Sequence, residues 1–356
     1  MGKIELDHTG SGSGITLSSD GTDLLLNGTA VGGGGGADLY AVETTGSTNP
    51  TASGTLSIAI GSGAVASGTS SVSIAKNTDA TGNSSTAVGI GAQATADYAT
   101  ALGVSAQATV TSALAVGYLS DALQEGAIAL GRSRASGVHS FAAGITTATS
   151  SYGALGHYSV AISQNAKASG YGGTAIGYYT QATGSDSFAV GYRSESTASD
   201  AYSFGNYAKS AIKGKLAYAS GQFAATGDAQ GGQFILRADT TDATATVLTT
   251  DNSTAGSANQ IVAASDTCIM FSGTIVAMQN GAQDQGGWEI KGLLKNDGGT
   301  TTLVSSNIQT FADGNGWTVA LSADNTNNAL AITCTGEAAH NIRWVANIST
   351  SEVTYA

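Results

Sequence analysis

The sequence is poor in proline, cysteine and charge, and each shortage narrows the possible architecture. Of its 356 residues, one is proline (Pro50), two are cysteine and 11% are charged. Two cysteines are too few for a disulfide scaffold; Cys268 and Cys334 could pair, or could lie in the core as free thiols. Low charge together with 41% apolar residues argues against intrinsic disorder, which needs high charge and low hydrophobicity.

Long apolar runs are also missing. No stretch of eighteen apolar residues is present, so we expect no membrane-spanning helix. The opening residues MGKIELDHTG lack the apolar core of a signal peptide, so we expect synthesis without one. Fifty glycines and abundant Ala, Ser and Thr leave too few bulky side chains for one large globular core, which favours a repetitive or fibrous fold.

Basic residues are scarce relative to acidic ones. The chain has 13 Lys and Arg against 25 Asp and Glu, which gives a formal net charge of −12. Binding to DNA or RNA requires clustered cations that neutralise phosphates, so we expect no nucleic-acid partner. The acidity suits an extended surface that must stay soluble.

Residues that would carry catalysis or bind a metal show no recognisable spacing. No HExxH, CxxC or nucleophile-elbow motif is present, and the four histidines are scattered: His8, His139, His157 and His340. Two carboxylate pairs, Asp121 with Glu125 and Glu195 with Asp200, have the chemistry of a glycosidase site, but solvated loop charges explain them as well. We therefore expect no enzyme activity, no cofactor and no resident metal.

What the sequence contains instead is a repeat. A motif such as STAVG recurs twelve times, and we name its last residue the anchor position. Most steps are fourteen residues, one is thirteen and one is nineteen, with anchors at positions 61, 75, 89, 103, 117, 131, 144, 163, 177, 191, 205 and 219. A repeat of this period predicts a solenoid.

Each copy predicts two short strands with alternating side chains. The first alternates small and large residues up to the anchor, and the second alternates Ala with an often polar residue. A fourteen-residue coil is thin, so the small residues should line its interior. The large residues before the anchors should then face another subunit. This outward column comprises Ile60, Ile74, Val88, Leu102, Val116, Leu130, Ile162, Ile176, Val190 and Phe204.

The sequence of one copy also resembles that of a nucleotide-binding loop. Gly89-Ile90-Gly91-Ala92-Gln93-Ala94 fits the GxGxxA pattern of dinucleotide-binding folds. That loop requires a preceding strand and a following helix, whereas another short strand and another repeat follow here. We therefore assign these glycines to tight corners that need a positive φ.

The repeats resemble a known family. The segments SIAIGSGAVASG (57–68), STAVGIGAQATA (85–96), SVAISQNAKASG (159–170) and GTAIGYYTQATG (173–184) resemble the head repeats of YadA-like trimeric adhesins. The resemblance covers about residues 51–220 and implies a left-handed parallel β-roll that assembles as a homotrimer. The same head repeats also occur in bacteriophage fibre proteins.

The residues before the repeats predict an attachment segment, residues 1–46. Its stretch ITLSSDGTDLLLNGTAVGG resembles N-terminal segments of phage fibre and structural proteins, which implies docking on other virion proteins of the tail or capsid. The run GGGGG at 32–36 predicts a flexible hinge before the β-roll, which we assign to residues 47–221.

The residues after the repeats, 222–356, predict an antiparallel, jelly-roll-like β-sandwich. About eight strand-like runs are separated by Asp, Gly and Asn turns, and we expect Trp288, Trp317 and Trp344 in the core. SGQFAATGDAQGGQFILRADTTDATATVLTTDN together with the closing IRWVANISTSEVTYA resembles the C-terminal module of marine-phage (cyanophage-like) fibre proteins.

Two groups of residues are candidates for receptor contact. Tyrosines at the coil corners can stack on sugar rings or merely pack against one another: Tyr118, Tyr178, Tyr179, Tyr192 and Tyr207. The turns of the C-terminal domain are the second group: Gln283, Asp284, Gln285, Asp297, Asp313 and Asn315. In a trimer each site would occur three times, and weak binding would gain avidity.

The leading hypothesis is a trimeric tail-fibre protein of a bacteriophage, made in the host cytoplasm and located in the virion. Its roll is a rigid spacer, and it adheres to a host surface glycan or outer-membrane receptor without catalysis. The alternatives are a capsid head fibre or decoration protein, a bacterial trimeric surface adhesin, and a polysaccharide depolymerase.

Overall fold

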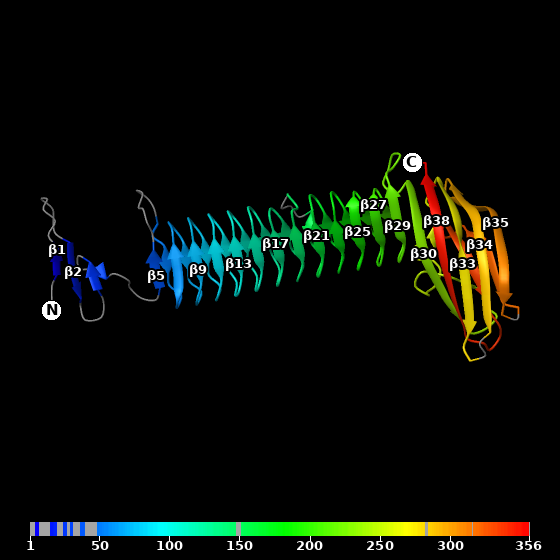
Figure 1. Ribbon diagram of the computed structural model, residues 1–356, viewed down its shortest axis with the longest axis horizontal. Helices are drawn as coiled ribbons and strands as arrows, with labels where there is room; N and C mark the ends of the chain where they lie inside the picture. Colours follow the sequence, from blue (N-terminus) through cyan, green and yellow to red (C-terminus); the bar gives the residue numbers. More distant parts are fainter. Residues whose placement is uncertain are drawn as a thin grey trace. The chain divides into compact units, whose positions relative to one another are not determined.

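The computed structural model describes residues 48–146, 151–281, 284–314 and 316–355, together with five N-terminal strands. The described residues form strands and turns and contain no helix, so none of them forms a helix able to cross a membrane. Two compact units are present, Met1–Gly144 and Ile145–Ala356, and each is described by itself (Figure 1). The all-β fold predicted from the sequence is confirmed.

The first unit begins with short strands. β1 (Ile4–Leu6), β2 (Ile15–Ser19), β3 (Leu24–Leu26) and β4 (Thr29–Ala30) form an antiparallel sheet, and β5 (Gly36–Leu39) pairs in parallel with β7. Most of the predicted glycine hinge, residues 32–35, lies outside the described residues, and Gly36 begins β5.

Next in this unit come parallel coils, each with one strand in each of two walls. The first wall contains β7 (Ser57–Ile60), β9 (Val72–Ile74), β11 (Thr86–Val88), β13 (Thr100–Leu102), β15 (Leu114–Val116), β17 (Ile128–Leu130) and β19 (Phe141–Ala143). The second wall contains β6 (Thr51–Ala52), β8 (Val65–Ala66), β10 (Asp79–Ala80), β12 (Gln93–Ala94), β14 (Gln107–Ala108), β16 (Asp121–Ala122) and β18 (Arg134–Ala135).

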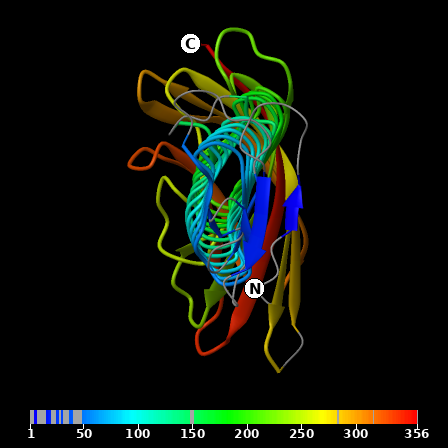
Figure 2. The same ribbon diagram turned by 90° about the vertical axis from the view of Figure 1, so that its left-hand side faces the viewer.

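Neighbouring coils are offset by one sequence repeat. Ala87 pairs with Ala101 and Ala101 with Ala115, so equivalent residues stack directly. In Figure 2 the coils of this unit, in blue and cyan, overlie one another. The interior is lined by alanines of both walls, such as Ala87 of the first wall and Ala94 of the second, which are fully buried. Small side chains fill the coil because its two walls lie too close together for larger ones.

The corners of the coils depend on backbone conformation more than on residue type. Gly89 has φ 126° and Gly91 has φ 66°, between β11 and β12, which confirms the corner assignment of the GxGxxA sequence. Ala75 occupies the same anchor position one coil earlier, with φ 113°. The repeat therefore imposes a positive φ at this corner even where the residue is not glycine.

The second unit opens with the same two-walled coils. Its first wall contains β21 (Val160–Ile162), β23 (Thr174–Ile176), β25 (Phe188–Tyr192), β27 (Tyr202–Asn206) and β29 (Leu216–Ser220). Its second wall contains β20 (Gly153–Ala154), β22 (Lys167–Ala168), β24 (Gln181–Ala182), β26 (Glu195–Ser196) and β28 (Lys209–Ser210). The strands pair in parallel with a fourteen-residue offset, for example Ala175 with Ala189.

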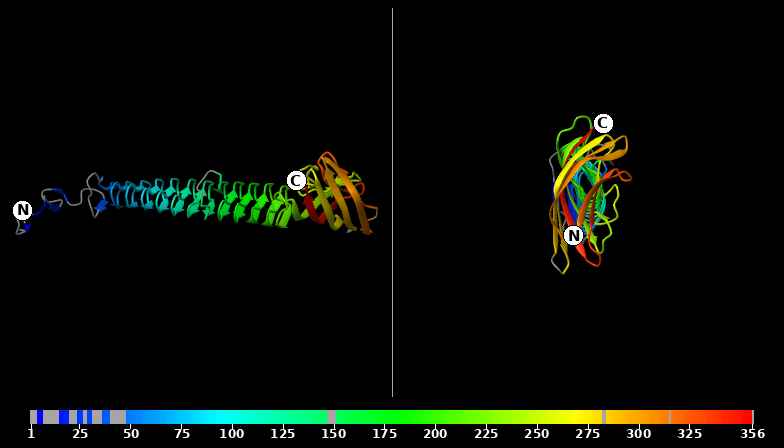
Figure 3. Two further views of the ribbon diagram at one scale, coloured as in Figure 1. Left: turned by 90° about the horizontal axis from the view of Figure 1, so that it is seen from above. Right: turned by 90° about the vertical axis from the view of Figure 1, so that its right-hand side faces the viewer.

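The second unit ends in an antiparallel sandwich (Figure 3). One sheet has five long strands, ordered β30 (Ala229–Thr240), β38 (Ile342–Thr354), β33 (Thr267–Gln279), β34 (Gln285–Asp297) and β35 (Thr300–Asp313). The other sheet is built on β37 (Ala329–Thr335), which pairs with β31 (Thr246–Val247), β32 (Ile261–Val262) and β36 (Thr318–Asp324).

The sandwich core is aromatic, in contrast to the alanine interior of the coils. Trp288, Trp317 and Trp344 are at most 3% exposed, which confirms their predicted place in the core. Trp344 stacks on Trp288 with ring centroids 5.4 Å apart and donates a hydrogen bond from Nε1 to Thr240.

The two cysteines are free thiols and form no disulfide. Cys268 is half-buried and Cys334 is fully buried. Burial raises the pKa of the Cys334 thiol to about 12, which makes this sulfur a packing group with little thiolate character.

Candidate functional site

Tyrosines at the corners of the second unit's coils form one continuous ladder. Tyr178 stacks on Tyr192 with centroids 5.4 Å apart and an interplanar angle of 11°. Tyr192 meets Tyr207 edge-to-face at 5.2 Å, and Tyr179 meets Tyr178 in the same way at 4.6 Å. We name these four residues the tyrosine ladder: Tyr178, Tyr179, Tyr192 and Tyr207.

The side chain of Arg193 lies against the tyrosine ladder. The guanidinium of Arg193 lies 5.2 Å from the ring centroid of Tyr179 and 5.7 Å from that of Tyr192. A hydrogen bond with the Tyr192 side chain is the main cause of the raised pKa of Tyr207. Much of the ring surface is therefore used within the ladder. Of its members, Tyr192 is the most open, with 37% exposure.

Backbone geometry explains why these rings meet. Tyr179, Arg193 and Tyr207 occupy equivalent positions two residues after the anchor, and their φ angles lie between 52° and 61°. This left-handed conformation recurs coil after coil, so side chains that leave the corner stack at the spacing of the strands, about 4.8 Å. Sequence spacing predicted the tyrosine column, but the part played by Arg193 was missed.

Tyr118, the fifth predicted tyrosine, stands apart from the ladder. It belongs to the first unit, is 58% exposed, and makes no ring contact with the residues that the structure describes. A corner position alone therefore does not create an aromatic cluster; neighbouring coils must also supply rings.

Two of the four carboxylates considered for glycan cleavage, Asp121 and Glu195, are engaged in ion pairs along the second wall. Asp121 Oδ2 lies 3.7 Å from Arg134 Nη1, and Glu195 Oε2 lies 3.9 Å from Lys209 Nζ. Burial raises the pKa of Asp121, and Arg134 opposes that shift. Each pair joins equivalent positions of adjacent coils, so these carboxylates neutralise neighbouring cations.

The outward column lies on the open side of the first wall in both units. Its residues are half-buried in the single chain, and Phe204 is 40% exposed. In the second unit the ring of Phe204 lies 5.6 Å from that of Phe188. The interface role assigned to these ten residues stays a prediction, but within each unit their apolar side chains do share one surface.

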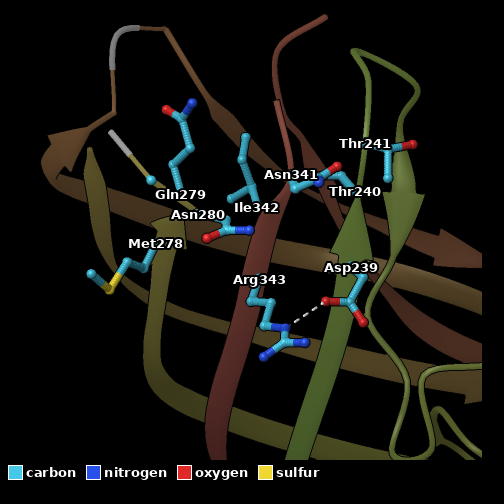
Figure 4. A pocket seen from close by; sticks show the side chains of 10 residues that line it. Asp239, Thr240, Thr241, Met278, Gln279, Asn280, Asn341, Ile342 and Arg343 are labelled. Carbon is cyan, nitrogen blue, oxygen red and sulfur yellow. Dashed lines mark hydrogen bonds and ion pairs between the residues drawn. The ribbon is translucent and has the colours of Figure 1, made fainter. Parts of the chain in front are cut away.

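The sandwich has a pocket of about 640 Å³ with a mixed polar and apolar lining, at the place where β30 and β33 end and β38 begins (Figure 4). We name it the strand-end pocket. It is lined by the last residues of β30 and β33, the first residues of β38 and the loops beyond them: Asp239, Thr240, Thr241, Met278, Gln279, Asn280, Gly281, Asn341, Ile342 and Arg343. The Arg343 guanidinium donates from Nε to Asp239 Oδ1 across 3.2 Å (Figure 4).

One lining side chain has unused hydrogen-bonding capacity. Gln279 is only 7% exposed, and its Oε1 has no hydrogen-bond partner among the residues that the structure describes. A buried carbonyl oxygen without a donor is costly, and such groups are normally paired with a ligand or water. Asp239, Arg343 and the two asparagines add donors and acceptors around it.

The predicted loop residues divide between two ends of the sandwich. Asp284 and Gln285 lie beside the strand-end pocket, because Gln285 pairs with Met278 and the Gln279 N–H donates to the Asp284 carbonyl. Asp313 pairs with Gly286 at the same end. Asp297 lies at the other end, 3.6 Å from Lys295, and Gln283 and Asn315 lie outside the described residues.

No group of three or more His, Cys, Asp or Glu side chains suited to a metal occurs among the residues that the structure describes. The residues that line the strand-end pocket were not predicted from the sequence as a site. They come from three distant segments, and the only local signal was a polar turn after each strand.

The coils match a known family. Residues 52–74, 80–110, 111–133, 154–180 and 168–194 match the family model of the YadA head domain repeat (2 copies). All five segments lie in the parallel coils, so the resemblance predicted from the sequence is confirmed over residues 52–194. No curated protein matches the chain.

Proposed function

Because residues 52–194 carry YadA head domain repeats, we propose that this chain is the subunit of a homotrimeric bacteriophage tail fibre that adheres to the host surface. The coils act as a rigid spacer, and the sandwich carries a receptor site. Residues 1–46 dock on other virion proteins. The mechanism is multivalent adhesion without a catalytic step.

The outward column is the observation that supports a trimer most directly. Ten mostly β-branched or aromatic side chains, spaced one coil apart, remain half-exposed in the single chain. Each would contribute about 1.5–3 kcal/mol if a neighbouring subunit covered it fully. YadA head domains form homotrimers, and this column is the surface on which such packing would occur.

The strand-end pocket supports a polar receptor such as a surface glycan. Sugar hydroxyls need both donors and acceptors, which Arg343, Asn280 and Asp239 supply, while Met278 offers apolar surface to a sugar ring. Three copies on one fibre would turn weak individual sites into firm attachment.

The assignment to a virus rests on the resemblance of both ends of the chain to phage fibre proteins. The family match by itself equally favours a bacterial trimeric surface adhesin, which would use the same column and pocket. Labelling with antibodies separates these possibilities: label on phage tails supports a tail fibre, label on capsids a head fibre, and label on bacterial surfaces an adhesin.

Two measurements on the purified full-length chain test the proposal. Light scattering should give three times the mass of one chain. On an array of bacterial surface glycans the protein should bind at least one class without releasing reducing ends. Arg343→Ala should weaken that binding, whereas Lys295→Ala at the other end of the sandwich should not. A monomer, or binding that both variants leave unchanged, would contradict it.

A further inference from the structure

Charged residues are segregated between the two corners of the coils. We name the corner that follows each first-wall strand the ladder corner, because it carries the tyrosine ladder, and the turn that precedes each first-wall strand the opposite corner. In the second unit, the residues one and two places after the anchors include Arg193 and no Asp or Glu. The opposite corner carries Asp186 and Asp200, and its Lys213 is paired with Asp251. The residues of the ladder corner therefore offer an anion a cation and no negative charge.

The first unit, taken by itself, has the same arrangement. Lys76 and Arg132 lie at the positions that follow its anchors, which again include no Asp or Glu, and Asp97 and Glu125 lie at the opposite corner. The whole chain has 25 acidic residues against 13 basic ones, so a corner with cations and no acids is not what its composition leads us to expect. The local charge at this corner favours an anionic ligand.

Arg193 is the cation that the tyrosine ladder holds in place. Its backbone N–H donates to the carbonyl of Tyr178 across 2.9 Å, and its guanidinium lies against the rings of Tyr179 and Tyr192. Contact with two rings restricts the conformations of an exposed arginine, so less side-chain entropy is lost when a ligand binds. The guanidinium is thus positioned at the surface before any ligand arrives.

The N–H donors of this guanidinium are not used within the chain. Among the residues that the structure describes, no carboxylate forms an ion pair with Arg193 and no acceptor takes a hydrogen bond from its side chain. Arg134 and Arg343, by contrast, are paired with Asp121 and Asp239. A guanidinium presents its donors in a planar fork that matches the two oxygens of a carboxylate. The ladder corner therefore has an oxyanion site that no described acid of the chain fills.

The rings beside Arg193 suit a sugar. Tyr192 is 37% exposed, and its side chain hydrogen-bonds that of Tyr207. The apolar face of a pyranose packs on an aromatic ring, and phenolic hydroxyls both donate to and accept from sugar hydroxyls. Equivalent corner positions recur at about 4.8 Å, close to the length of one sugar unit in an extended chain. Successive sugars of a linear polysaccharide can therefore contact successive coils.

The net charge of the chain limits the kind of polyanion that this corner can bind. At −12 the protein repels nucleic acids and densely sulfated chains, which require clustered cations. One positioned guanidinium in each second unit suits a polymer with sparse charge. A polysaccharide in which a uronic acid alternates with a neutral sugar has that charge spacing.

We propose that the ladder corner of the second unit binds an acidic polysaccharide of alternating uronic acid and neutral sugars, with a carboxylate on Arg193 and a neighbouring sugar ring on Tyr192. The site shares no residue with the strand-end pocket and is complete within one chain. It therefore depends neither on the trimer nor on the assignment to a phage. It gives the coils a binding role beyond that of a spacer.

Hyaluronan oligosaccharides, in which glucuronate alternates with N-acetylglucosamine, test this on the full-length protein. Calorimetry should show binding that is at least about tenfold weaker for the same oligosaccharides with their carboxyls reduced to alcohols, because the charge-assisted hydrogen bonds are lost. Binding should also weaken as salt is added, since the guanidinium is exposed. Equal affinity for the two forms, or no binding of either, would overturn the inference.

Two matched variants locate the site. Arg193→Gln removes the guanidinium and should weaken hyaluronan binding at least about tenfold. Arg132→Gln removes the same charge at a corner of the first unit, where the side chain contacts no ring among the described residues, so affinity should stay within about twofold of the parent. Arg193→Lys keeps the charge without the planar fork and should fall between them. Equal losses in the two glutamine variants would indicate attraction by overall charge and would contradict a site on the ladder.

Arg343→Ala separates this inference from the proposed receptor pocket. If hyaluronan binding is lost in Arg343→Ala and kept in Arg193→Gln, the acidic ligand lies in the strand-end pocket and the inference is wrong. If no surface glycan depends on Arg343 while hyaluronan depends on Arg193, the proposed pocket fails and the inference stands. Single-stranded DNA that binds as tightly as hyaluronan and competes with it would assign the site to phosphate, which would also overturn the inference.

Discussion

Lys215 and Glu352 form a buried ion pair between the last coil and the sandwich of the second unit. Their side chains are 6% and 8% exposed, and Lys215 Nζ lies 2.6 Å from Glu352 Oε2. Gln230 and Thr350 also donate to the carboxylate, at 2.8 and 2.7 Å. The charges are thus paired and hydrogen-bonded where little of either side chain reaches solvent, which ties the coils to β38.

We expect Glu352→Gln to destabilise the second unit by about 3–5 kcal/mol, because it leaves the ammonium of Lys215 buried without its counter-charge. Denaturant unfolding measures the change. Lys213→Met is the matched control: its partner is Asp251 and its side chain is 39% exposed, so the loss should be near 1 kcal/mol or less. Equal losses in the two variants would show that burial of the pair has no energetic consequence.

The anchor corner gives a second prediction, on the first unit. A Cβ on Gly89 would lie 2.5 Å from the carbonyl oxygen of Gly103 in the next coil, and the residue has φ 126°. Gly89→Ala should therefore destabilise the roll by about 2–5 kcal/mol, from backbone strain plus overpacking. Thermal unfolding followed by circular dichroism at the β-sheet band measures this.

Ala75→Gly is the opposite change at an equivalent corner. Relief of about 1–2 kcal/mol of left-handed strain exceeds the 0.4–1 kcal/mol that the more flexible unfolded chain costs, so the variant should be equal to or slightly more stable than the parent. A clear loss of stability in Ala75→Gly would mean that the alanine methyl group contributes packing that outweighs its strain.

These corners belong to a part of the fold that the sequence predicts well. Because the interior admits only small side chains, Ala87, Ala101 and Ala115 had to recur at one period, and that period specified the walls, the register and the outward column. The sequence also placed Tyr178 and Tyr192 at neighbouring corners. It did not reveal Arg193, because its contact with two rings depends on side-chain direction at a left-handed residue.

The sequence predicts the fold class of the sandwich, but it does not predict which residues of the sandwich form a pocket. Alternating apolar residues and buried tryptophans indicate its strands, yet antiparallel partners such as β30 and β38 are more than a hundred residues apart. Which strand ends meet depends on that pairing. Asp239, Gln279 and Arg343 therefore line a pocket that no local sequence pattern predicts. Asp297, which was chosen as a candidate from a similar turn, lies at the other end of the sandwich.

The tyrosine ladder yields a third prediction. Tyr192 contacts two other rings, so Tyr192→Ala should cost about 1–3 kcal/mol of stability, at 0.5–1.5 kcal/mol for each aromatic pair. Tyr118→Ala, at a corner without ring contacts among the described residues, should change stability by less than about 0.5 kcal/mol. Chemical denaturation of the two variants measures the difference.

Glycan binding by the same variants then distinguishes packing from recognition. If the ladder serves only to pack, Tyr192→Ala loses stability and keeps its affinity for surface glycans below the unfolding transition. If it contacts the receptor, affinity falls as well, and Tyr192→Phe, which keeps the ring, retains most of it. A Tyr118→Ala variant with reduced affinity would instead point to the isolated corner as the contact.

Low pH should lower the free energy of unfolding of the second unit, because Asp251 becomes protonated. Burial raises the pKa of this carboxyl, but hydrogen bonds from Ser253, Asn259 and Lys213 outweigh burial and hold the pKa well below its ordinary value of 3.8. A depressed pKa stabilises the folded state fully above the unfolded pKa, and that contribution disappears as the pH falls below about 4 toward the folded pKa. We therefore expect the free energy of unfolding to fall over this range.

Asp251→Asn removes the titrating group and keeps one acceptor for the same donors. It should be less stable than the parent at pH 7, because the charge-assisted bonds from Lys213 and Asn259 are lost. Its stability should then fall less steeply between pH 4 and 2, the acid range that Asp251 governs. Urea unfolding at several pH values gives both slopes. Parallel curves for the two proteins would show that other carboxylates, such as Asp228 with its backbone donors, account for the acid sensitivity.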